Sequence, residues 1–273
     1  MTDIIYEKQD LRYLNWSTIR RSSGTAGSFL KSQEETDDGK IYYKLSSYDA
    51  FHGVTGHECV NEIIADRLLT ILGIEHLSYQ LIHAVITVDQ KDIETWLCAS
   101  GDFKHKGESK IALDAYYQAE KQENESPLDF CIRCGWEKTV YEMLVFDYLI
   151  LNRDRHGANM EVLRSRTDRT VRLAPLFDHG ISLLFHCADD AAAEKEDLLA
   201  DKPVQCFVGS RSARNNLNLI PTDRYPQLNR LKKSDRSFVT GGLDQILSGT
   251  MSDRIWEMIW KRWEVYEDLC NQR

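Results

Sequence analysis

The chain has 273 residues, of which 42% are hydrophobic and 28% are charged, an ordinary balance for a globular protein. Its net charge is −9 and its pI is near 5.4. This argues against direct nucleic-acid binding, because such binding needs many Lys and Arg side chains to neutralise phosphates. We expect no membrane location, since no apolar run is long enough to cross a bilayer.

Seven cysteines are scattered along the chain, and an odd number of thiols in a chain of this size is typical of a reducing cytosol. The acidic N-terminus also lacks the apolar centre of a signal peptide. Together these features predict a cytoplasmic protein. The single C-x-x-C pair, Cys131 and Cys134, leaves two interpretations open: a zinc or redox site, or two thiols near the end of a helix.

The first hundred residues predict strands around one helix. Residues 39–47, "GKIYYKLSS", are rich in Tyr and Ile and predict a strand. Residues 57–74 place apolar side chains on one helical stripe, with Gly73 as a stop signal. Two further strands are predicted over 79–88 and 92–100.

A polar connection over residues 101–110, "GDFKHKGESK", follows these strands. Because the pattern becomes helical after it, we place a lobe boundary there. The chain then divides into an N-terminal lobe of residues 1–103 and a C-terminal lobe of residues 104–273.

The second lobe is predominantly helical. Residues 137–151 are apolar nearly all round, which predicts a helix buried in the centre of a domain. Residues 252–273 predict an amphipathic helix with Ser252 or Asp253 as its N-cap. Residues 188–240 are the least regular part, and indicate either a substrate-facing insertion or irregular surface.

A predicted hairpin brings two polar residues together. Residues 160–165 and 170–177 flank the turn "RTDR", which favours an antiparallel pair of strands. Closing that hairpin makes Asn159 and Asp178 neighbours. Asp154 lies in the loop just before, at the end of the predicted buried helix.

These three side chains have the types that phosphoryl transfer needs. Mg²⁺ takes carboxylate and amide oxygens as ligands, and a further carboxylate must lie near the attacking hydroxyl. The step from Asp154 to Asn159, followed later by Asp178, repeats the order of a kinase catalytic loop and its metal-binding Asp. Taken singly, each residue is explained as a turn former or a helix cap. Their joint order favours catalysis.

The motifs "NRDRHGAN" (152–159) and "PLFDHG" (175–180) resemble the HipA-like Ser/Thr kinase family, and the DRHxxN form is also similar to phosphatidylinositol kinases. The resemblance implies an α+β, two-lobed protein-kinase-like fold with a small β-rich N-lobe and a larger, mostly helical C-lobe. It also implies ATP and Mg²⁺ as cofactors and a protein substrate. Several HipA-like proteins are toxins with a cognate antitoxin, so an antitoxin or regulatory partner is a further expectation.

By this resemblance Asp154 is the catalytic carboxylate, and Asn159 and Asp178 hold the metal. His156 matches the family's loop histidine, and we interpret it as a brace for the loop. A small-residue stretch near the N-terminus is either a flexible turn or, as the resemblance implies, the phosphate loop. Its residues are Ser22, Ser23, Gly24, Thr25, Ala26, Gly27 and Ser28, of which Ser22, Ser23 and Thr25 are candidate modification sites.

Lys44 lies inside the first predicted strand, between the small-residue loop and the helix. This order indicates the strand lysine that binds ATP phosphates, although a strand lysine is often solvent-facing. Its expected helix partner is Glu62, with Glu58 as the alternative. The adenine-contacting residues are expected near the end of the strand over 92–100, at Leu97, Cys98 and Ala99.

The predicted function is therefore an ATP- and Mg²⁺-dependent kinase that phosphorylates a protein Ser or Thr hydroxyl, with autophosphorylation as a further expectation. Two alternatives stay open at this point. One is a lipid or small-molecule kinase, suggested by DRHxxN. The other is a catalytically idle nucleotide-binding module that docks a partner.

Overall fold

The computed structural model describes residues 3–17, 29–37 and 39–271. Its N-terminal part is built around a five-stranded sheet in the order β1-β6-β7-β3-β2. β1 pairs with β6 in parallel, and the other neighbours are antiparallel. The elements are β1 (Ile4–Asp10), β2 (Lys31–Thr36), β3 (Gly39–Leu45), β4 (Tyr48–Asp49), β5 (Gly53–Val54), α1 (Glu58–Leu72), β6 (Tyr79–Val88) and β7 (Lys91–Gly101).

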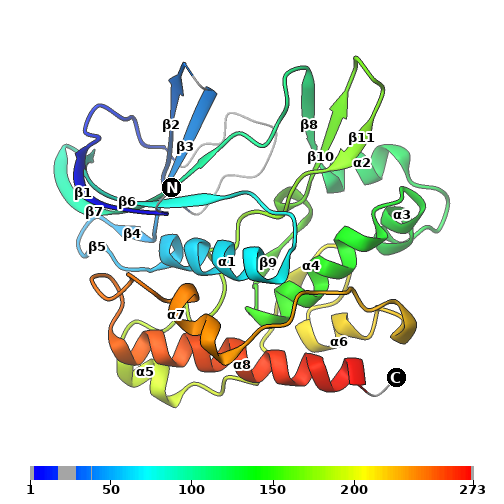
Figure 1. Cartoon of the computed structure of the whole chain (residues 1–273). Coiled ribbons are helices and arrows are strands. Elements are labelled where there is room, and N and C mark those ends of the chain that lie inside the picture. Colours follow the sequence, from blue (N-terminus) through cyan, green and yellow to red (C-terminus); the bar gives the residue numbers. More distant parts are fainter. Residues whose placement is uncertain (1–2, 18–28, 38, 272–273) are drawn as a thin grey trace.

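Side chains from alternate strand positions divide between the two faces of this sheet, as the two-residue period of a strand requires. Leu81 and Cys98 join the main core with α1, whereas Ile82 and Leu97 belong to a second, smaller core on the other face. Figure 1 shows α1 lying beneath the sheet. The sheet is thus covered on the side that leads to the rest of the molecule.

The predicted strands and helix of this lobe are observed with small shifts at their ends. α1 ends at Leu72 because Gly73 adopts a left-handed conformation with φ of 74°. Its amide then donates to the carbonyls of the preceding turn, which is the usual way in which a glycine ends a helix. β1 was not predicted, since its sequence "IIYEKQD" is apolar only at its start.

The C-terminal part holds most of the helices around the buried α4, and α8 runs along its base (Figure 1). Its elements are β8 (Glu108–Ala112), α2 (Leu113–Glu120), α3 (Pro127–Arg133), α4 (Glu137–Leu149), β9 (Asp154–Arg155), a 3₁₀ turn (Gly157–Asn159), β10 (Glu161–Ser165), β11 (Val171–Leu173), α5 (Asp190–Lys195), β12 (Gln205–Cys206), α6 (Ala213–Leu217), 3₁₀ turns (Thr222–Arg224 and Lys233–Asp235), α7 (Arg236–Val239) and α8 (Gly249–Asn271).

Helix α4 is buried on all sides after its first turn, as its mostly apolar sequence predicts. From Val140 to Leu149 every residue is buried, including Asp147. The helix forms the centre of the main core, which runs without a break from α1 to α8. Because the loop after α4 is anchored to this rigid element, its side chains are held in fixed positions.

The predicted hairpin is present as β10 and β11, and β8 adds a third strand. β11 stops at Leu173, earlier than the predicted strand over 170–177, because Pro175 has no amide hydrogen for a ladder. The chain then crosses to the other lobe. Leu176 donates to the Glu75 carbonyl at 3.2 Å and accepts from the Leu77 amide at 2.9 Å.

The C-terminal helix begins earlier than predicted. α8 starts at Gly249, so Ser252 and Asp253 lie inside the helix and neither is its N-cap. The Ser248 hydroxyl accepts from the Met251 amide at 3.0 Å and satisfies one of the free amides of the first turn.

Residues 188–240 contain only short elements but are not loose surface, because many of their apolar side chains belong to the main core.

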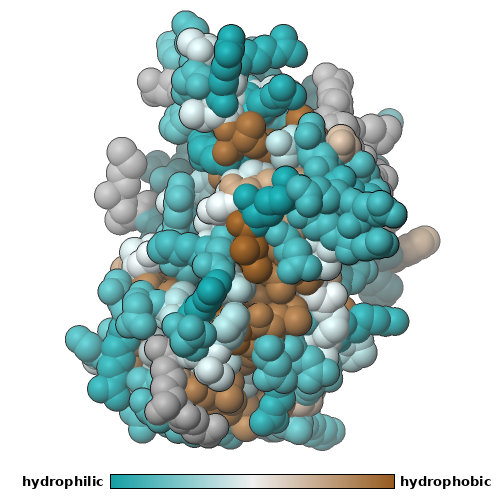
Figure 2. Space-filling view, turned by 90° about the vertical axis from the view of Figure 1, so that its right-hand side faces the viewer, coloured by the Kyte–Doolittle hydropathy of each residue, from teal (hydrophilic) through white to brown (hydrophobic). Residues whose placement is uncertain are grey.

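In the described part of the chain, every helix is too short or too polar to span a lipid bilayer. Figure 2 shows one face of the molecule, where hydrophilic side chains flank a narrow band of hydrophobic ones.

Candidate active site

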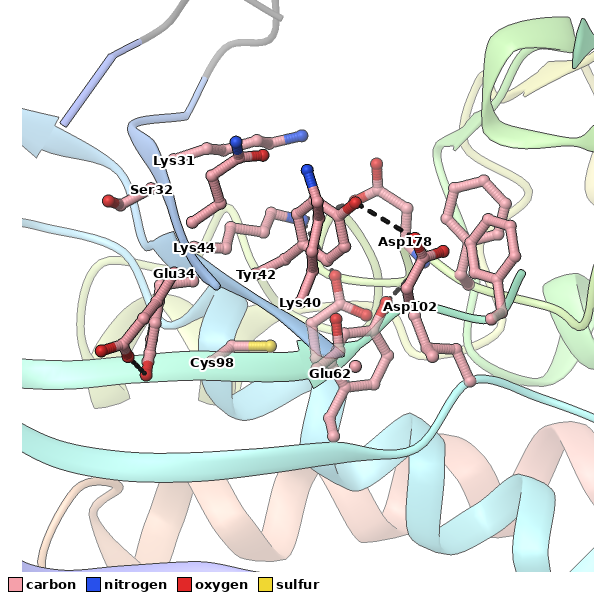
Figure 3. A pocket seen from close by; sticks show the side chains of 18 of the residues that line it. Lys31, Ser32, Glu34, Lys40, Tyr42, Lys44, Glu62, Cys98, Asp102 and Asp178 are labelled. Atoms are coloured by element: carbon pink, nitrogen blue, oxygen red, sulfur yellow. Dashed lines mark hydrogen bonds and ion pairs between the residues drawn. The ribbon is translucent and has the colours of Figure 1, made fainter. Parts of the chain in front are cut away.

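Lys44 on β3 forms the centre of a buried charge cluster between the lobes (Figure 3). Its ammonium donates to Glu62 Oε1 at 2.9 Å and to Asp178 Oδ1 at 2.5 Å. Burial alone would lower the pKa of Lys44, but the Asp178 and Glu62 carboxylates raise it well above its usual value. The lysine is therefore charged, and it is bound to its predicted partner Glu62 and also to Asp178.

Helix α1 supplies Glu62, whose side chain is fully buried. The second carboxylate oxygen of Glu62 accepts from the His179 amide at 2.8 Å. Glu58, the alternative partner, instead accepts from the amide and hydroxyl of Ser47, at 3.0 and 2.5 Å. The geometry thus pairs Lys44 with Glu62.

Asp178 is held in a left-handed backbone conformation with φ of 60°, which is uncommon for any residue except glycine. Its amide donates to the Tyr79 hydroxyl at 3.2 Å. The chain then passes directly over α1 at Gly180, where a Cβ would lie 3.1–3.2 Å from atoms of Glu58 and Glu62. A larger residue there would push this segment, and Asp178 with it, away from α1.

The loop after α4 carries the other two predicted groups. The Asn159 side-chain amide donates to the Asp154 carbonyl at 2.8 Å and to Asp154 Oδ2 at 3.3 Å. The Asn159 side-chain oxygen is buried and has no hydrogen-bond partner among the described residues. Such an orphaned acceptor is costly unless a cation or other donor joins it.

Asp154 is partly buried and chemically suited to accept a proton. Burial raises its pKa above the usual value for an aspartate; His156 opposes the shift, and the Asp178 carboxylate adds to it. His156 Nδ1 accepts from the Ala158 amide at 3.1 Å, and its Nε2 lies 3.6 Å from Asp154 Oδ1, so His156 contacts both the loop backbone and Asp154.

The two segments that carry the predicted metal ligands meet at one guanidinium. Arg155 Nη1 donates to the Asn159 carbonyl at 3.1 Å and to the Phe177 carbonyl at 2.9 Å. Since both carbonyls are within hydrogen-bond reach of one nitrogen, Asn159 and the residue preceding Asp178 are neighbours in space. The predicted hairpin geometry therefore has the expected result.

A cavity of about 870 Å³ opens beside the Lys44 cluster. Lys44, Glu62, Asp178 and Cys98 line it, whereas Asp154 and Asn159 are not among its lining residues. Phe103 and Phe177 also line the cavity, and their rings stack with centroids 5.4 Å apart. The cavity has a charged end and an aromatic side, a combination that suits a nucleotide.

Two of the three predicted adenine-contacting residues do not line the cavity, and residues further along the chain do. Leu97 and Ala99 point into the second core and do not line the cavity. The backbone of this part of β7 is paired with β3 and β6 on its two sides, so it has few groups left for a ligand. The cavity wall continues instead through residues 100–104.

The predicted phosphate loop, residues 22–28, lies outside the described residues. Ser17 and Lys31, on either side of the undescribed stretch, pair through two backbone hydrogen bonds of 2.9 and 3.0 Å. Both residues line the cavity. The assignment of Ser22 to Ser28 to phosphate binding stays a prediction.

Comparison with solved structures finds a kinase of similar architecture. The Helicobacter pylori proinflammatory kinase CtkA matches over 97% of this chain and 96% of its own, with a TM-score of 0.63 and 18% sequence identity. The chain shares the fold of that kinase. HipA from the toxin–antitoxin complex of Shewanella oneidensis MR-1 with HipB and operator DNA matches more weakly, with a TM-score of 0.41, 13% identity, and coverage of 90% of this chain and 58% of that one. No protein-family model and no curated protein matches the sequence.

The likeness to CtkA confirms the predicted two-lobed, kinase-like fold, and at 18% identity it shows the fold alone. In protein kinases, a strand lysine must pair with a helix glutamate for the nucleotide site to be active. Lys44 and Glu62 already have that arrangement.

The donor set fits a magnesium ion. Asn159 offers a buried oxygen without a partner, and Asp178 offers a carboxylate from the neighbouring segment. Mg²⁺ is commonly held by few protein oxygens together with substrate phosphates and water. These two residues are therefore the ones that would hold it.

Sequence reasoning missed the residues that support these groups. Arg155 and Asp147 form a buried pair, and Asn152 bonds to the same carboxylate. The signal was present, because Asp147 is the single charge in the apolar run from Met143 to Leu151, and a buried charge requires a partner.

Proposed function

We propose that the protein is a Mg²⁺-dependent kinase that transfers the γ-phosphoryl group of ATP to a protein Ser or Thr hydroxyl. The observation that carries the proposal is the Lys44 cluster at the charged end of the cavity, with Glu62 and Asp178 both in contact with the lysine. Arg155 joins the loop of Asp154 and Asn159 to the residue that precedes Asp178. Apart from Arg155, these are the groups that phosphoryl transfer by positioning and charge stabilisation requires.

Each group has one task in this mechanism. Lys44 binds the ATP phosphates, and Glu62 keeps its ammonium in place. Asn159 and Asp178 hold Mg²⁺, which when bound neutralises charge on the phosphates. Asp154 orients the acceptor hydroxyl and takes its proton as the oxygen bonds to the γ-phosphorus and the bond to the β-phosphate oxygen breaks.

The nature of the acceptor rests on the sequence. The resemblance of "NRDRHGAN" and "PLFDHG" to HipA-like kinases favours a protein substrate over a lipid or a small molecule. An antitoxin partner and phosphorylation of Ser22, Ser23 or Thr25 are proposals with the same basis, as is a cytoplasmic location. An idle nucleotide-binding module is the weaker alternative, because the lysine–glutamate pair is formed and no catalytic group is replaced.

The test uses the purified chain with γ-labelled ATP, Mg²⁺ and a cell extract, followed by mass spectrometry of the labelled species. We expect labelled Ser or Thr in one or a few proteins, and none with excess EDTA or with Asp178→Asn. Label on the chain itself at Ser22, Ser23 or Thr25 would show self-phosphorylation. Nucleotide binding without any transfer would contradict the proposed kinase and favour the docking module.

A further inference from the structure

We infer that Asp147, with its two bonded neighbours Arg155 and Asn152, is the element that positions the proposed catalytic groups. We call these three residues the Asp147 hub. The inference rests on the proposed function, and it concerns residues that do not themselves touch nucleotide or acceptor. They act through the three groups that do.

Asp147 lies near the end of α4 and is 8% exposed. Its carboxylate accepts from Arg155 Nε and Nη2, each at 2.9 Å, in the two-pronged geometry that arginine and carboxylate favour. It also accepts from the Asn152 side-chain amide at 2.9 Å. One carboxylate on a rigid helix therefore orients two side chains of the following loop.

Arg155 links Asp147 to the segments of both proposed metal ligands, Asn159 and Asp178. With Nε and Nη2 bound to Asp147, its Nη1 donates to the carbonyls of Asn159 and Phe177. The first carbonyl belongs to one ligand, and the second belongs to the residue before Asp178. The planar guanidinium thus fixes the distance between two segments that are far apart in the sequence.

Asn152 links Asp147 to the proposed base, Asp154. While its amide nitrogen donates to Asp147, its oxygen accepts from the Asp154 amide at 3.2 Å. The backbone of Asp154 is therefore set by the same carboxylate that orients Arg155. The positions of Asp154, Asn159 and Asp178 therefore all depend on the Asp147 carboxylate.

The burial of the Asp147 hub from solvent supports a positioning role. Arg155 is 1% exposed. Burial alone would lower its pKa, but Asp147 raises it above the usual value, so the guanidinium stays charged. A lysine at this position has a single ammonium and cannot present the same planar set of donors to a carboxylate and two carbonyls.

Arg262 on α8 provides a matched control. It is also 1% exposed, and its guanidinium donates to the carbonyls of Tyr148, Leu198 and Ala200 at 3.2, 2.9 and 2.8 Å. None of these residues carries a proposed metal ligand. Arg262→Lys therefore removes a buried guanidinium of equal exposure without touching the segments of Asn159 and Asp178.

The experiment compares Arg155→Lys, Arg262→Lys and Asn152→Ser with the wild type. Mn²⁺ binding is measured by electron paramagnetic resonance in the presence of a non-hydrolysable ATP analogue, and melting temperature and turnover are measured beside it. We expect both lysine variants to melt lower, but only Arg155→Lys to weaken Mn²⁺ binding, by about 10- to 100-fold as for groups that support metal ligands. Asn152→Ser should lower kcat with Mn²⁺ binding unchanged.

Mn²⁺ binding by Arg155→Lys that equals the wild type, or equal weakening by Arg262→Lys, would overturn the inference. If Arg155→Lys does not fold, an unchanged kcat for Asn152→Ser would still overturn it. A wild type that binds the Mn²⁺–nucleotide pair but transfers no phosphoryl group would count against the proposed function, while the Mn²⁺ data would still decide on the hub.

Discussion

Two buried charge clusters in this protein differ in balance and in access. Lys44 faces two carboxylates, Glu62 and Asp178, and all three side chains line the cavity. Arg155 faces one carboxylate, Asp147, and neither residue lines the cavity. The first cluster carries excess negative charge and opens to a ligand, whereas the second is neutral and closed.

This difference indicates that the Lys44 cluster binds a ligand, whereas the Arg155 cluster holds the structure around the site. A buried pair whose charges balance holds the surrounding structure, but a buried site with more carboxylates than cations is incomplete without a further positive charge. A metal–nucleotide complex would supply that charge beside Lys44. The predictions below change one cluster at a time and ask whether activity or stability responds.

The largest expected effect follows from removing a charge of the open cluster or its neighbour. Asp178→Asn should abolish ATP-dependent phosphorylation, and Asp154→Asn should lower it by roughly 10²- to 10⁴-fold, the usual contribution of a general base. Both variants should keep the wild-type circular dichroism, since Lys44 retains Glu62. Wild-type turnover in either variant would remove that residue from the mechanism.

The closed cluster should also contribute strongly to stability. Asp147→Asn leaves the buried guanidinium of Arg155 without its counter-ion, and should lower the free energy of unfolding by about 3–5 kcal/mol. Denaturant unfolding followed by fluorescence measures this change. Asp253→Asn, which breaks an exposed pair with Arg236, is the control, and its expected effect is below about 1 kcal/mol. Equal effects of the two variants would show that the buried pair is not special.

A double-mutant cycle sharpens the contrast within the open cluster. Lys44→Met leaves Glu62 and Asp178 facing each other without a cation, so Glu62→Gln should be less harmful, or even stabilising, in that background. The coupling between the two changes should be about 0.5–3 kcal/mol, as for residues in direct contact. Stability changes that simply add would mean that Lys44 does not neutralise Glu62.

The smallest expected effect is a pH dependence at the segment that leads to Asp178. His76 lies 3.3 Å from Asp66 and forms a β-bridge with Leu176. Burial alone would lower the pKa of His76, but the hydrogen bond with Asp66 raises it overall. The stabilisation is therefore fully present below the unfolded pKa, near 6.5, and is lost as pH rises through the higher folded pKa.

Melting temperatures of the wild type and His76→Gln, compared at pH 5.5 and pH 8.5, measure this contribution. We expect the wild type to exceed the variant by a few degrees at most at the lower pH, and by less at the higher pH. A difference that grows with pH would mean that the sign of the His76 shift is opposite.

Local patterns were sufficient to predict which residues lie near one another where a single segment contains the signal. The order of Asp154, Asn159 and Asp178 follows from motif spacing and one hairpin, and the register of α1 follows from its apolar stripe. The Arg155 contacts were not predictable, because they depend on where the Phe177 carbonyl lies in space. The inward direction of Leu97 was missed for a similar reason, since the face of a strand is fixed by its neighbours.

The most direct test is a structure of the protein with Mg²⁺ and a non-hydrolysable ATP analogue. The account predicts a cation about 2.0–2.1 Å from both the Asn159 side-chain oxygen and an Asp178 carboxylate oxygen, with Lys44 on the phosphates. A nucleotide bound in the cavity with its metal away from either residue would contradict it.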